Sequence, residues 1–269
     1  MKRPTLAENV VVITGASLGL GRELALQLAD QGACLGLAAR DADRLEEVAV
    51  RCRQRGARAI VIPTDVSQQS DCAHLMERIV SEYGRIDTLV NNAGLSMFAR
   101  FDELENLKVM EQLMQVNYFG SVYCTFYALP HLKRTRGRIV GICSLAGKMG
   151  LPTRSGYSAS KHAVAGFYEA LRVECKKDGL SVTVIFPGFV ATAIRERAIG
   201  PDGRPLGRSP YSETGVMTVE KCTRLMVKAI ADRRRELVMT VRGKMGQWLK
   251  LAAPRLVDNL ARKAVEQGH

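Results

Sequence analysis

Near its start the chain reads Val10-Val-Val-Ile-Thr-Gly-Ala-Ser-Leu-Gly-Leu-Gly21. The first five residues form a continuous β-branched run, which is typical of a parallel strand buried on both faces. Three glycines lie in the turn that follows, and after them apolar residues recur at helical spacing up to Ala29. Strand, glycine turn and helix in this order favour a dinucleotide-binding turn over an ordinary glycine-rich loop between a strand and a helix.

The three glycines of this turn have separable roles. Gly15 permits the tight turn, Gly19 lets the backbone approach a pyrophosphate, and Gly21 lets the helix pack closely on the strand. The helix N-terminus then directs free N–H groups and its positive dipole end toward the phosphates. The spacing is G-x-x-x-G-x-G rather than the more usual G-x-G-x-x-G, so the interpretation depends on the strand and helix around it.

Arg40 ends the next apolar run, residues 33–39. Near this place an acid would bind the ribose 2′-hydroxyl of NAD. An acid would repel a 2′-phosphate, whereas a guanidinium binds phosphate through two parallel bonds. We therefore predict NADP(H) as the cofactor, with Arg40 and the Ser17 hydroxyl at the 2′-phosphate. The alternative is that Arg40 is a solvated charge at a strand end.

Tyr157 and Lys161 lie four residues apart at the start of an expected helix, so they share one helical face. A nearby ammonium favours the phenolate and lowers the pKa of a tyrosine from its usual value of ~10. Such a phenol can act as a general acid/base. Ser144 ends an earlier apolar run, and its hydroxyl could hold a substrate oxygen. Taken alone, a Tyr-x-x-x-Lys pair is more often solvated helix surface.

These motifs together resemble the short-chain dehydrogenase/reductase family, in its NADP-preferring single-domain type. The resemblance covers roughly residues 8–240, and its specificity comes from the order of the whole set. The matching pieces are the glycine turn from Thr14 to Gly21, Asp65-Val66, Asn91-Asn-Ala-Gly94, Asn117, Ser144, Tyr157-x-x-x-Lys161 and Pro187-Gly188.

The resemblance implies a role for each matching position. The implied catalytic tetrad is Asn117, Ser144, Tyr157 and Lys161. The implied cofactor-binding residues are Gly15, Ser17, Leu18, Gly19, Leu20, Gly21, Arg40, Asp65, Val66, Asn92, Ala93, Gly94, Tyr157, Lys161, Pro187, Gly188, Val190 and Thr192.

Within these sets the resemblance implies more specific contacts. Asn117 would hold a water that links Lys161 to solvent, and Asp65 would hold the adenine amine. Residues 91–94 would stabilise the central sheet and border the cofactor. The nicotinamide amide would be bound by Pro187 and Gly188 together with Val190 and Thr192.

The chain also departs from the family pattern, and several positions have alternative interpretations. Leu18 stands where many NADP-binding members carry a second basic residue, and Leu20 replaces the commoner isoleucine. Asp65 could cap the helix that follows it, Asn117 could be a polar break on an amphipathic helix, and Ser144 could be a strand-end hydroxyl. Asn91 and Asn92 could be turn residues.

Apolar runs alternate with helical stretches along the chain. We expect strands near residues 10–14, 34–39, 58–62, 87–91, 137–143, 181–186 and 236–240. This alternation predicts an α/β fold of the Rossmann type, a doubly wound, seven-stranded, mostly parallel sheet with right-handed crossovers. The cofactor would lie across the carboxyl ends of the strands. We expect one dinucleotide-binding and catalytic domain over residues 1–240, with a C-terminal helical extension over residues 241–269.

Composition narrows the class further. The chain has 269 residues, a net charge of +12, seven cysteines without paired spacing and four scattered histidines. Unpaired cysteines fit a reducing cytosol, and the histidines predict no metal site. We find no signal-peptide pattern and no run of ~20 apolar residues. No aromatic stacking cluster or nucleic-acid-reading motif accompanies the charge, so we expect no nucleic-acid binding.

Residues 193–217 are dense in Gly, Pro and Arg and follow the expected nicotinamide-binding residues. We expect them to form a lid over the active site, the alternative being a passive loop. Several apolar residues that follow catalytic or cofactor motifs predict an apolar pocket, although each would also fit a core position. These residues are Leu95, Met97, Met149, Leu151 and Phe189.

Residues 241–269 combine apolar residues near helical spacing with interspersed Lys and Arg, and they include Trp248, the only tryptophan. Pro254 should kink this pattern. A basic amphipathic helix can lie on an anionic membrane surface. The alternative is a helix that contacts another subunit or covers the pocket. We therefore expect a cytoplasmic protein. If the first interpretation of residues 241–269 holds, the protein is also peripheral to a membrane.

The expected function is that of an NADPH-dependent carbonyl reductase acting on a hydrophobic, steroid- or lipid-like ketone or its secondary alcohol. One alternative is a 3-oxoacyl carrier-protein reductase, because a basic surface suits an acidic carrier. Another is a non-catalytic cofactor-sensing or scaffold protein, although a sensor needs no proton donor. By resemblance, the chain would form a homodimer or homotetramer through helices near residues 105–130 and 155–178.

Overall fold

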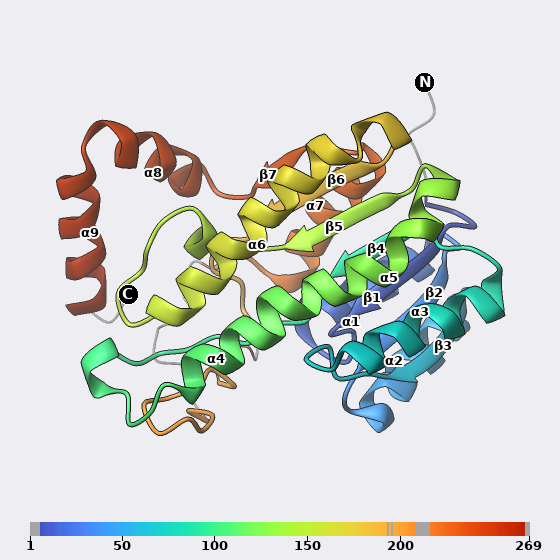
Figure 1. Ribbon diagram of the computed structural model, residues 1–269, viewed down its shortest axis with the longest axis horizontal. Coiled ribbons are helices and arrows are strands. Elements are labelled where there is room, and N and C mark those ends of the chain that lie inside the picture. Colours follow the sequence, from blue (N-terminus) through green and yellow to red (C-terminus); the bar gives the residue numbers. More distant parts are fainter. Residues whose placement is uncertain (1–5, 193, 195, 208–215, 267–269) are drawn as a thin grey trace.

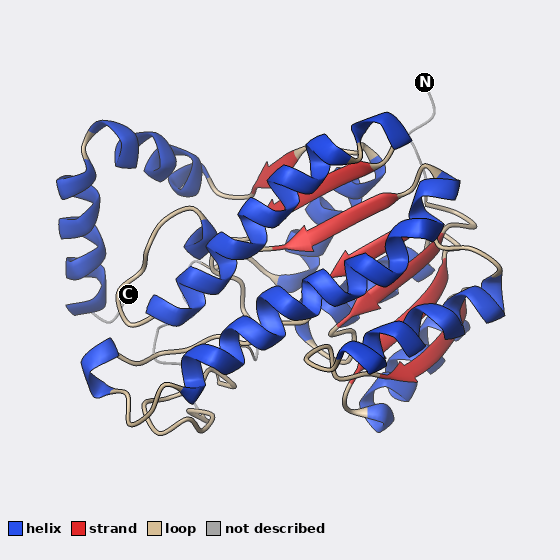
Figure 2. Ribbon diagram, viewed as in Figure 1, coloured by secondary structure: helices blue, strands red, loops and turns tan. Residues whose placement is uncertain are grey.

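The computed structural model describes residues 6–192, 194, 196–207 and 216–266. Its strands are β1 (Val10–Thr14), β2 (Cys34–Ala39), β3 (Arg58–Pro63), β4 (Thr88–Asn91), β5 (Arg138–Ile142), β6 (Ser181–Phe186) and β7 (Glu236–Val238). They form one sheet in the order β3-β2-β1-β4-β5-β6-β7, and every pairing in it is parallel. The predicted α/β class, the single domain and the seven-stranded sheet are confirmed, and Figure 2 shows the strands lying between the helices.

Helices cover both faces of this sheet (Figure 1). The helices are α1 (Gly19–Ala29), α2 (Ala42–Gln54), α3 (Gln69–Tyr83), α4 (Lys108–Met114), α5 (Gly120–Thr135), α6 (Ser155–Glu174), α7 (Val219–Ala231), α8 (Val241–Ala252) and α9 (Pro254–Glu266). Apolar side chains of α1, α2 and α7 form the core on one face, and those of α3, α5 and α6 form the core on the other. The last two helices, α8 and α9, project from the body at the end of the sheet that β7 occupies (Figure 1).

The β-branched run of β1 explains why this strand is central. Val11 and Ile13 pack with α1 on one face, while Val10 and Val12 pack in the core of the other face. The chain leaves β1 toward β2 on one side of the sheet, and β4 pairs with β1 on the other. Parallel sheets bind ligands beyond the carboxyl ends of their strands at such a reversal of strand order. The glycine turn that follows β1 therefore lies at the expected binding edge.

Four strand boundaries differ from the sequence-based prediction. The strand expected over 58–62 extends to Pro63, and the one expected over 87–91 starts at Thr88. The strand expected over 137–143 is shorter at both ends, and the one expected over 236–240 ends at Val238. β7 is an edge strand that pairs only with residues 184–186. Thr240 then accepts a hydrogen bond from the Gly243 N–H and caps α8. The apolar run therefore extends past the end of β7 because its last residues lead into a helix.

The break between α8 and α9 also differs from expectation. Pro254 was expected to kink a helix, but α8 ends at Ala252 and α9 begins at Pro254. Ala253 has φ −143° and ψ 67°, outside the helical region. A residue before proline is disfavoured in the helical region, and proline is well suited to the first helical position. The helix therefore ends and a second one starts.

Gly141 in β5 gives a stability prediction. A Cβ there would overlap the ring of Tyr168, which crosses β5 and whose hydroxyl accepts a 2.7 Å hydrogen bond from Asn91 Nδ2. We expect Gly141→Ala to destabilise the fold by about 1–3 kcal/mol through overpacking, as measured by urea unfolding.

Gly166 provides the matched control for this substitution. It lies in α6, and a Cβ added there meets nothing within 4 Å. Because alanine is the better helix former, Gly166→Ala should stabilise the protein slightly. Equal unfolding midpoints for both variants would show that the Tyr168 ring does not need the space at Gly141.

Candidate functional site

One large pocket lies at the carboxyl ends of the strands, with a volume of about 1730 Å³. Pockets for drug-sized ligands are usually roughly 300–1,000 Å³, so this one is large enough for a dinucleotide and a second molecule together. Every residue that we predicted for catalysis or cofactor binding lines it, except Gly21 and Asn117. These two lie behind its wall and support residues that do line it.

The glycine turn forms one end of the pocket, and its backbone shows why glycine is needed. Gly15 has φ +64°, and a Cβ there would lie 2.8 Å from Ala93 Cα. A Cβ on Gly21 would run into the Gly15 carbonyl oxygen, so this residue permits the close packing of α1 on β1. The N-cap residue of α1, Leu18, offers no side-chain cap, so the first N–H groups of α1 suit a phosphate.

Residues 91–94 tie β4 to this turn. The Asn92 side chain donates to the carbonyl oxygens of Thr14 and Gly15 at 2.9 and 3.1 Å. Thr14 Oγ1 in turn accepts from the N–H groups of Asn92 and Ala93 at 3.0 and 3.1 Å. Asn91 instead is buried and donates to Tyr168 and Thr125. The turn interpretation of these asparagines is therefore too weak, because both fix the relative position of the central strands.

A basic corner lies where β2 ends. Arg40 lines the pocket, and so does Arg44, which sequence reasoning missed. Asp41 lies between them, but its carboxylate caps α2 by accepting from Arg44 N–H at 3.1 Å and lies 3.3 Å from Arg44 Nε. Arg44 could have been found from its position in the first turn of the helix that follows Arg40. Arg44 thus adds a second guanidinium to this corner of the pocket, where Leu18 carries no charge.

The adenine end of the predicted site holds Asp65 and Val66. Asp65 Oδ1 accepts from the Ser67 N–H at 3.0 Å and from Ser67 Oγ at 2.8 Å. Both residues line the pocket. The carboxylate thus organises the turn before α3, and at the same time it lies where a ligand amine would reach it. Because α3 begins at Gln69 with Gln68 as its N-cap residue, Asp65 does not cap the helix, and its contact with an adenine amine stays a prediction.

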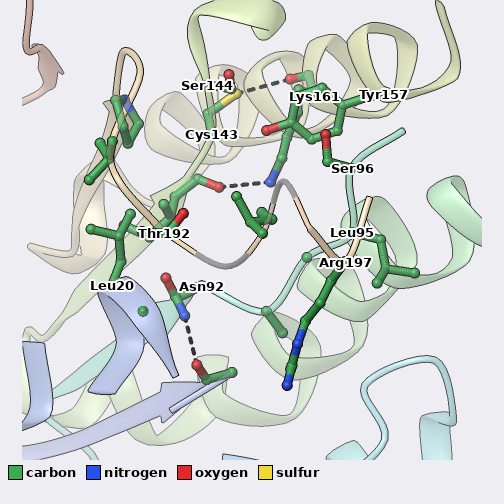
Figure 3. Close-up of a pocket in the computed structure, with 18 of the residues that line it drawn as sticks. Leu20, Asn92, Leu95, Ser96, Cys143, Ser144, Tyr157, Lys161, Thr192 and Arg197 are labelled. Atoms are coloured by element: carbon green, nitrogen blue, oxygen red, sulfur yellow. Dashed lines mark hydrogen bonds between the residues drawn. The ribbon is translucent and has the colours of Figure 1, made fainter. Parts of the chain in front are cut away.

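Ser144, Tyr157 and Lys161 gather at one side of the pocket, whereas Leu20 and Thr192 lie toward the other side (Figure 3). Tyr157 and Lys161 come from the first turns of α6 and are 7% and 5% exposed. Lys161 Nζ lies 5.9 Å from the centroid of the Tyr157 ring and donates to the Ile142 carbonyl oxygen at 3.0 Å. The pair is therefore not solvated helix surface, which was the alternative interpretation.

The Ser144 hydroxyl is positioned to donate a hydrogen bond into the pocket. Its Oγ accepts a 3.2 Å hydrogen bond from Ala146 N–H, and the residue caps the short 3-10 turn η3 (Leu145–Gly147). Because the accepted bond uses a lone pair, the hydroxyl hydrogen can point to a substrate oxygen. Ser144 is a strand-end hydroxyl, as its alternative interpretation proposed, and it also lines the pocket.

Asn117, the fourth residue of the implied tetrad, lies behind the wall of the pocket. It lies in the π-helical turn η2 (Gln115–Phe119) and is 1% exposed. Its Oδ1 accepts from Leu95 N–H at 2.7 Å, and its Nδ2 donates to Leu95 O at 3.0 Å and to Ser160 Oγ at 2.9 Å. Both amide donors are thus used by protein groups. The side chain fixes residue 95 as a strand partner would, and the water that the resemblance implied stays a prediction.

Ser160 extends this network to the tyrosine and was not predicted. Its Oγ donates to the Tyr157 carbonyl oxygen at 2.8 Å and is fully buried. The Asn117–Ser160 bond therefore couples the π turn to the helical turn that carries Tyr157. Only the contact across two helices makes this visible, since Ser160 in the sequence is simply a helix residue next to Lys161.

The segment after β6 closes over the pocket. Pro187, Gly188, Val190 and Thr192 line it, as do Ile194, Ile199 and Pro205. Ile199 is tied to the opposite wall, because its N–H donates to Ser96 O at 2.9 Å and its carbonyl accepts from Phe98 N–H at 3.0 Å. The expected lid over 193–217 includes residues 193, 195 and 208–215, which lie outside the described residues, so its mobility stays a prediction.

The apolar wall was predicted with one error. Leu95, Met149, Leu151 and Phe189 line the pocket, but Met97 does not. Met97 is fully buried and packs in a small core with Tyr157, because alternate residues of this extended segment point to opposite sides.

Sequence reasoning also missed Ser96 and Arg154 in the wall. Ser96 lies beside Tyr157 in Figure 3, and Arg154 lies one helical turn before Tyr157. The Arg154 guanidinium lies 4.0 Å from the ring centroid of Phe98. Gly243 and Gly246 of α8 and Leu260 of α9 also border the pocket, in line with the alternative that the C-terminal extension covers it.

Cys143 next to Ser144 is not a nucleophile candidate. Burial raises the pKa of its thiol to about 11, although the nearby Lys161 charge opposes this shift. A thiol with so high a pKa stays protonated at neutral pH. Among the described residues, no group of three or more His, Cys, Asp or Glu side chains could hold a metal ion. The chemistry available in the pocket is that of a phenol, a hydroxyl and an ammonium.

The residues present fit a dinucleotide phosphate. The uncapped N-terminus of α1 and the glycine turn suit the pyrophosphate, and the basic corner suits a further phosphate on the ribose. A Cβ on Gly94 would lie 3.1 Å from Asn117 Oδ1 and 3.4 Å from Lys161 Nζ, so glycine at this position leaves room beside the lysine.

Comparison with known proteins shows the family to which this chain is similar. The sequence profile of the short chain dehydrogenase family matches residues 9–200. An 11-beta-hydroxysteroid dehydrogenase A from Sesamum indicum is 37% identical over 262 residues, covering 94% of this chain and 74% of that protein. An 11-beta-hydroxysteroid dehydrogenase-like 4A from Arabidopsis thaliana is 43% identical over 183 residues, covering 68% of this chain and 61% of that protein.

A solved structure shows the same fold. It is an alcohol dehydrogenase from the archaeon Thermococcus sibiricus, complexed with 5-hydroxy-NADP. It matches with a TM-score of 0.74 and 28% sequence identity, covering 86% of this chain and 95% of that chain.

Proposed function

The chain belongs to the short-chain dehydrogenase family of nicotinamide-dependent oxidoreductases, and we propose that it is an NADPH-dependent carbonyl reductase for hydrophobic, steroid- or lipid-like ketones and their secondary alcohols. The observation that carries this proposal is the gathering of Ser144, Tyr157 and Lys161 at one side of a pocket whose other end holds the glycine turn. Relatives named as hydroxysteroid dehydrogenases and the apolar wall around residues 149–151 support the substrate class.

The roles of the three side chains follow from their geometry. When bound, NADP(H) supplies or accepts the hydride. As a ketone is reduced, negative charge develops on its oxygen, and groups that act on that charge stabilise the transition state most. Tyr157 donates its proton to this oxygen, and Ser144 donates a hydrogen bond to it. The buried Lys161 ammonium compensates the charge left on the Tyr157 oxygen.

A substrate screen tests the proposed activity. Ketones and alcohols of increasing chain length would be offered with NADPH and NADP⁺ while nicotinamide absorbance is followed. We expect turnover to rise with the apolar surface of the substrate. Activity restricted to short polar ketones, or to acyl groups linked to a carrier protein, would contradict the proposed substrate class.

Preference for NADPH is assigned to the basic corner. Replacing Arg40 with Asp should weaken NADPH binding roughly 10- to 100-fold, because a charge-assisted bond is lost and a repulsive charge is introduced. NADH binding should change little. The matched control is Arg51→Asp on the outer surface of α2, away from the pocket. An unchanged NADPH/NADH ratio in Arg40→Asp would mean that another residue, such as Arg44, reads the phosphate.

We also propose a homodimer through the outer faces of α5 and α6. Phe126 and Val173 on these helices are 66% and 74% exposed. Phe126→Lys should shift the mass in solution toward the monomer, as measured by size-exclusion chromatography with light scattering. A wild-type monomer, or a variant with unchanged mass, would contradict this interface. The described cysteines are free and buried, which supports a reducing compartment such as the cytosol.

A further inference from the structure

The C-terminal arm, defined as α8 and α9 (residues 241–266), presents apolar side chains to solvent. On α8, Met245, Trp248 and Leu251 are 65%, 74% and 78% exposed. On α9, Leu256 and Leu260 are 49% and 53% exposed. An amphipathic helix normally turns its apolar side to the protein core. Here Met245, Trp248 and Leu251 of α8 point outward instead, so their exposure needs an explanation that the fold of the arm does not supply.

The inner side of α8 explains this orientation. Gly243 and Gly246 face the loop after β5, where a Cβ would lie 2.6 Å from Leu145 Cδ2 and 3.0 Å from Met149 Cε, respectively. Lys250 Nζ donates to the Lys148 carbonyl oxygen at 3.1 Å. Glycines allow the helix to lie close to this loop, and its remaining side, with Trp248, then faces away. We call Met245, Trp248 and Leu251 the apolar stripe. The packing of α8 on the loop thus fixes the exposure of this stripe, which does not result from fraying of the helix end.

The positive charge of the arm indicates which kind of surface covers the apolar stripe. Residues 241–269 contain six Lys or Arg against two Asp or Glu. Two copies of the arm packed together would bring like charges close, which is costly across an interface. An anionic lipid surface removes the same apolar residues from water and attracts the cations. Tryptophan is also suited to the boundary between headgroups and acyl chains. Among the described residues, no helix is long and apolar enough to cross a bilayer, so the arm would lie in the surface.

We propose that the C-terminal arm docks the protein on an anionic lipid surface. The arm borders the pocket through Gly246, Leu260 and Lys263, and Phe189 and Ile194 of the pocket wall are 49% and 41% exposed. Docking through the arm therefore places the pocket beside the lipid. That a lipophilic substrate reaches the pocket from the lipid rests on the proposed function, whereas docking itself does not.

Vesicle flotation of the full chain tests this proposal without any measurement of activity. The probes are phosphatidylcholine vesicles with and without phosphatidylglycerol. We expect flotation with the anionic vesicles, decreasing as salt is raised, and much weaker flotation with phosphatidylcholine alone. No flotation, or equal flotation with both vesicles, would overturn the assignment to anionic lipid.

Two sets of variants separate the apolar and the charged contributions. The double variant Trp248→Glu, Leu251→Glu should lower vesicle affinity at least about tenfold. Its control, Val50→Glu, changes an aliphatic residue of α2 that is 41% exposed. The double variant Lys244→Gln, Arg255→Gln should lower affinity roughly fivefold per residue, with Arg51→Gln, Arg224→Gln as its control. Equal losses in variants and controls would contradict docking through the arm.

A second copy of the chain is the competing occupant. All variants would first be checked for an unchanged unfolding midpoint and unchanged NADPH binding, and then for mass in solution. If Trp248→Glu, Leu251→Glu changes the oligomeric mass in the absence of lipid, the arm is a subunit contact and the proposal is overturned. Unchanged mass together with lost flotation supports it. Failure of the substrate screen would leave this result unaffected.

Discussion

Tyr157→Phe is expected to lower turnover by about 10²–10⁴-fold while leaving NADPH affinity within about twofold of wild type. The substitution removes only the phenolic hydroxyl. The ring, which is 7% exposed and packs with Met97 and Leu113, keeps its contacts, so the fold should not change. A positioned general acid contributes to the rate and not to the binding of the cofactor, which explains the expected split between turnover and affinity.

The control for this variant is Tyr127→Phe. Tyr127 lies on α5, and its hydroxyl accepts a 2.9 Å hydrogen bond from Gln69 on α3. It does not line the pocket, so turnover should stay at the wild-type value. Steady-state rates would be combined with NADPH titration by fluorescence. Normal turnover by Tyr157→Phe would show that another group protonates the substrate oxygen.

Lys161→Met has the second largest expected effect, and it should lower both turnover and cofactor affinity. Methionine keeps the length of the buried stem but removes the ammonium, which lies 5.9 Å from the Tyr157 ring centroid. We expect at least about 100-fold loss of turnover, because the charge that develops on the tyrosine oxygen is no longer compensated. We expect about tenfold weaker NADPH binding, because the resemblance to the family also implies that Lys161 binds the ribose hydroxyls of the cofactor.

Lys228 is exposed on α7 and does not line the pocket. Lys228→Met is the matched control, since it removes the same charge outside the pocket. Stopped-flow single-turnover rates would separate the chemical step from product release. If Lys161→Met bound NADPH with unchanged affinity, the ribose contact would be wrong. If its single-turnover rate were unchanged, the proposal that the Lys161 ammonium compensates charge on the Tyr157 oxygen would be wrong as well.

The fold could be predicted well from the sequence because its strongest signals are local. A continuous β-branched run such as residues 10–14 fits only a strand buried on both faces, and the structure places Val11 and Val12 in opposite cores. The ends of β5 and β7 could not be predicted as well. Apolar residues continue past both strands, and only pairing with a neighbouring strand determines where each one stops.

The site could be predicted as a set of residues but not as a set of contacts. The motif around Tyr157 indicated which side chains meet, since helical spacing alone places Lys161 beside it. Asn117 shows the limit, because its pairing with residue 95 requires a π turn and a close approach of two segments. The arm shows another limit. Periodicity revealed an apolar side on residues 241–266, whereas only packing shows that Trp248 faces solvent.

A crystal structure of the full chain with bound NADP⁺ tests the account most directly. We predict the pyrophosphate at the N-terminus of α1, the 2′-phosphate within hydrogen-bonding reach of Arg40 or Arg44, and the nicotinamide ring facing the Tyr157 hydroxyl with room for one carbonyl group between them. A nicotinamide ring bound away from Tyr157 and Ser144, in crystals that also accommodate a substrate alcohol, would contradict it.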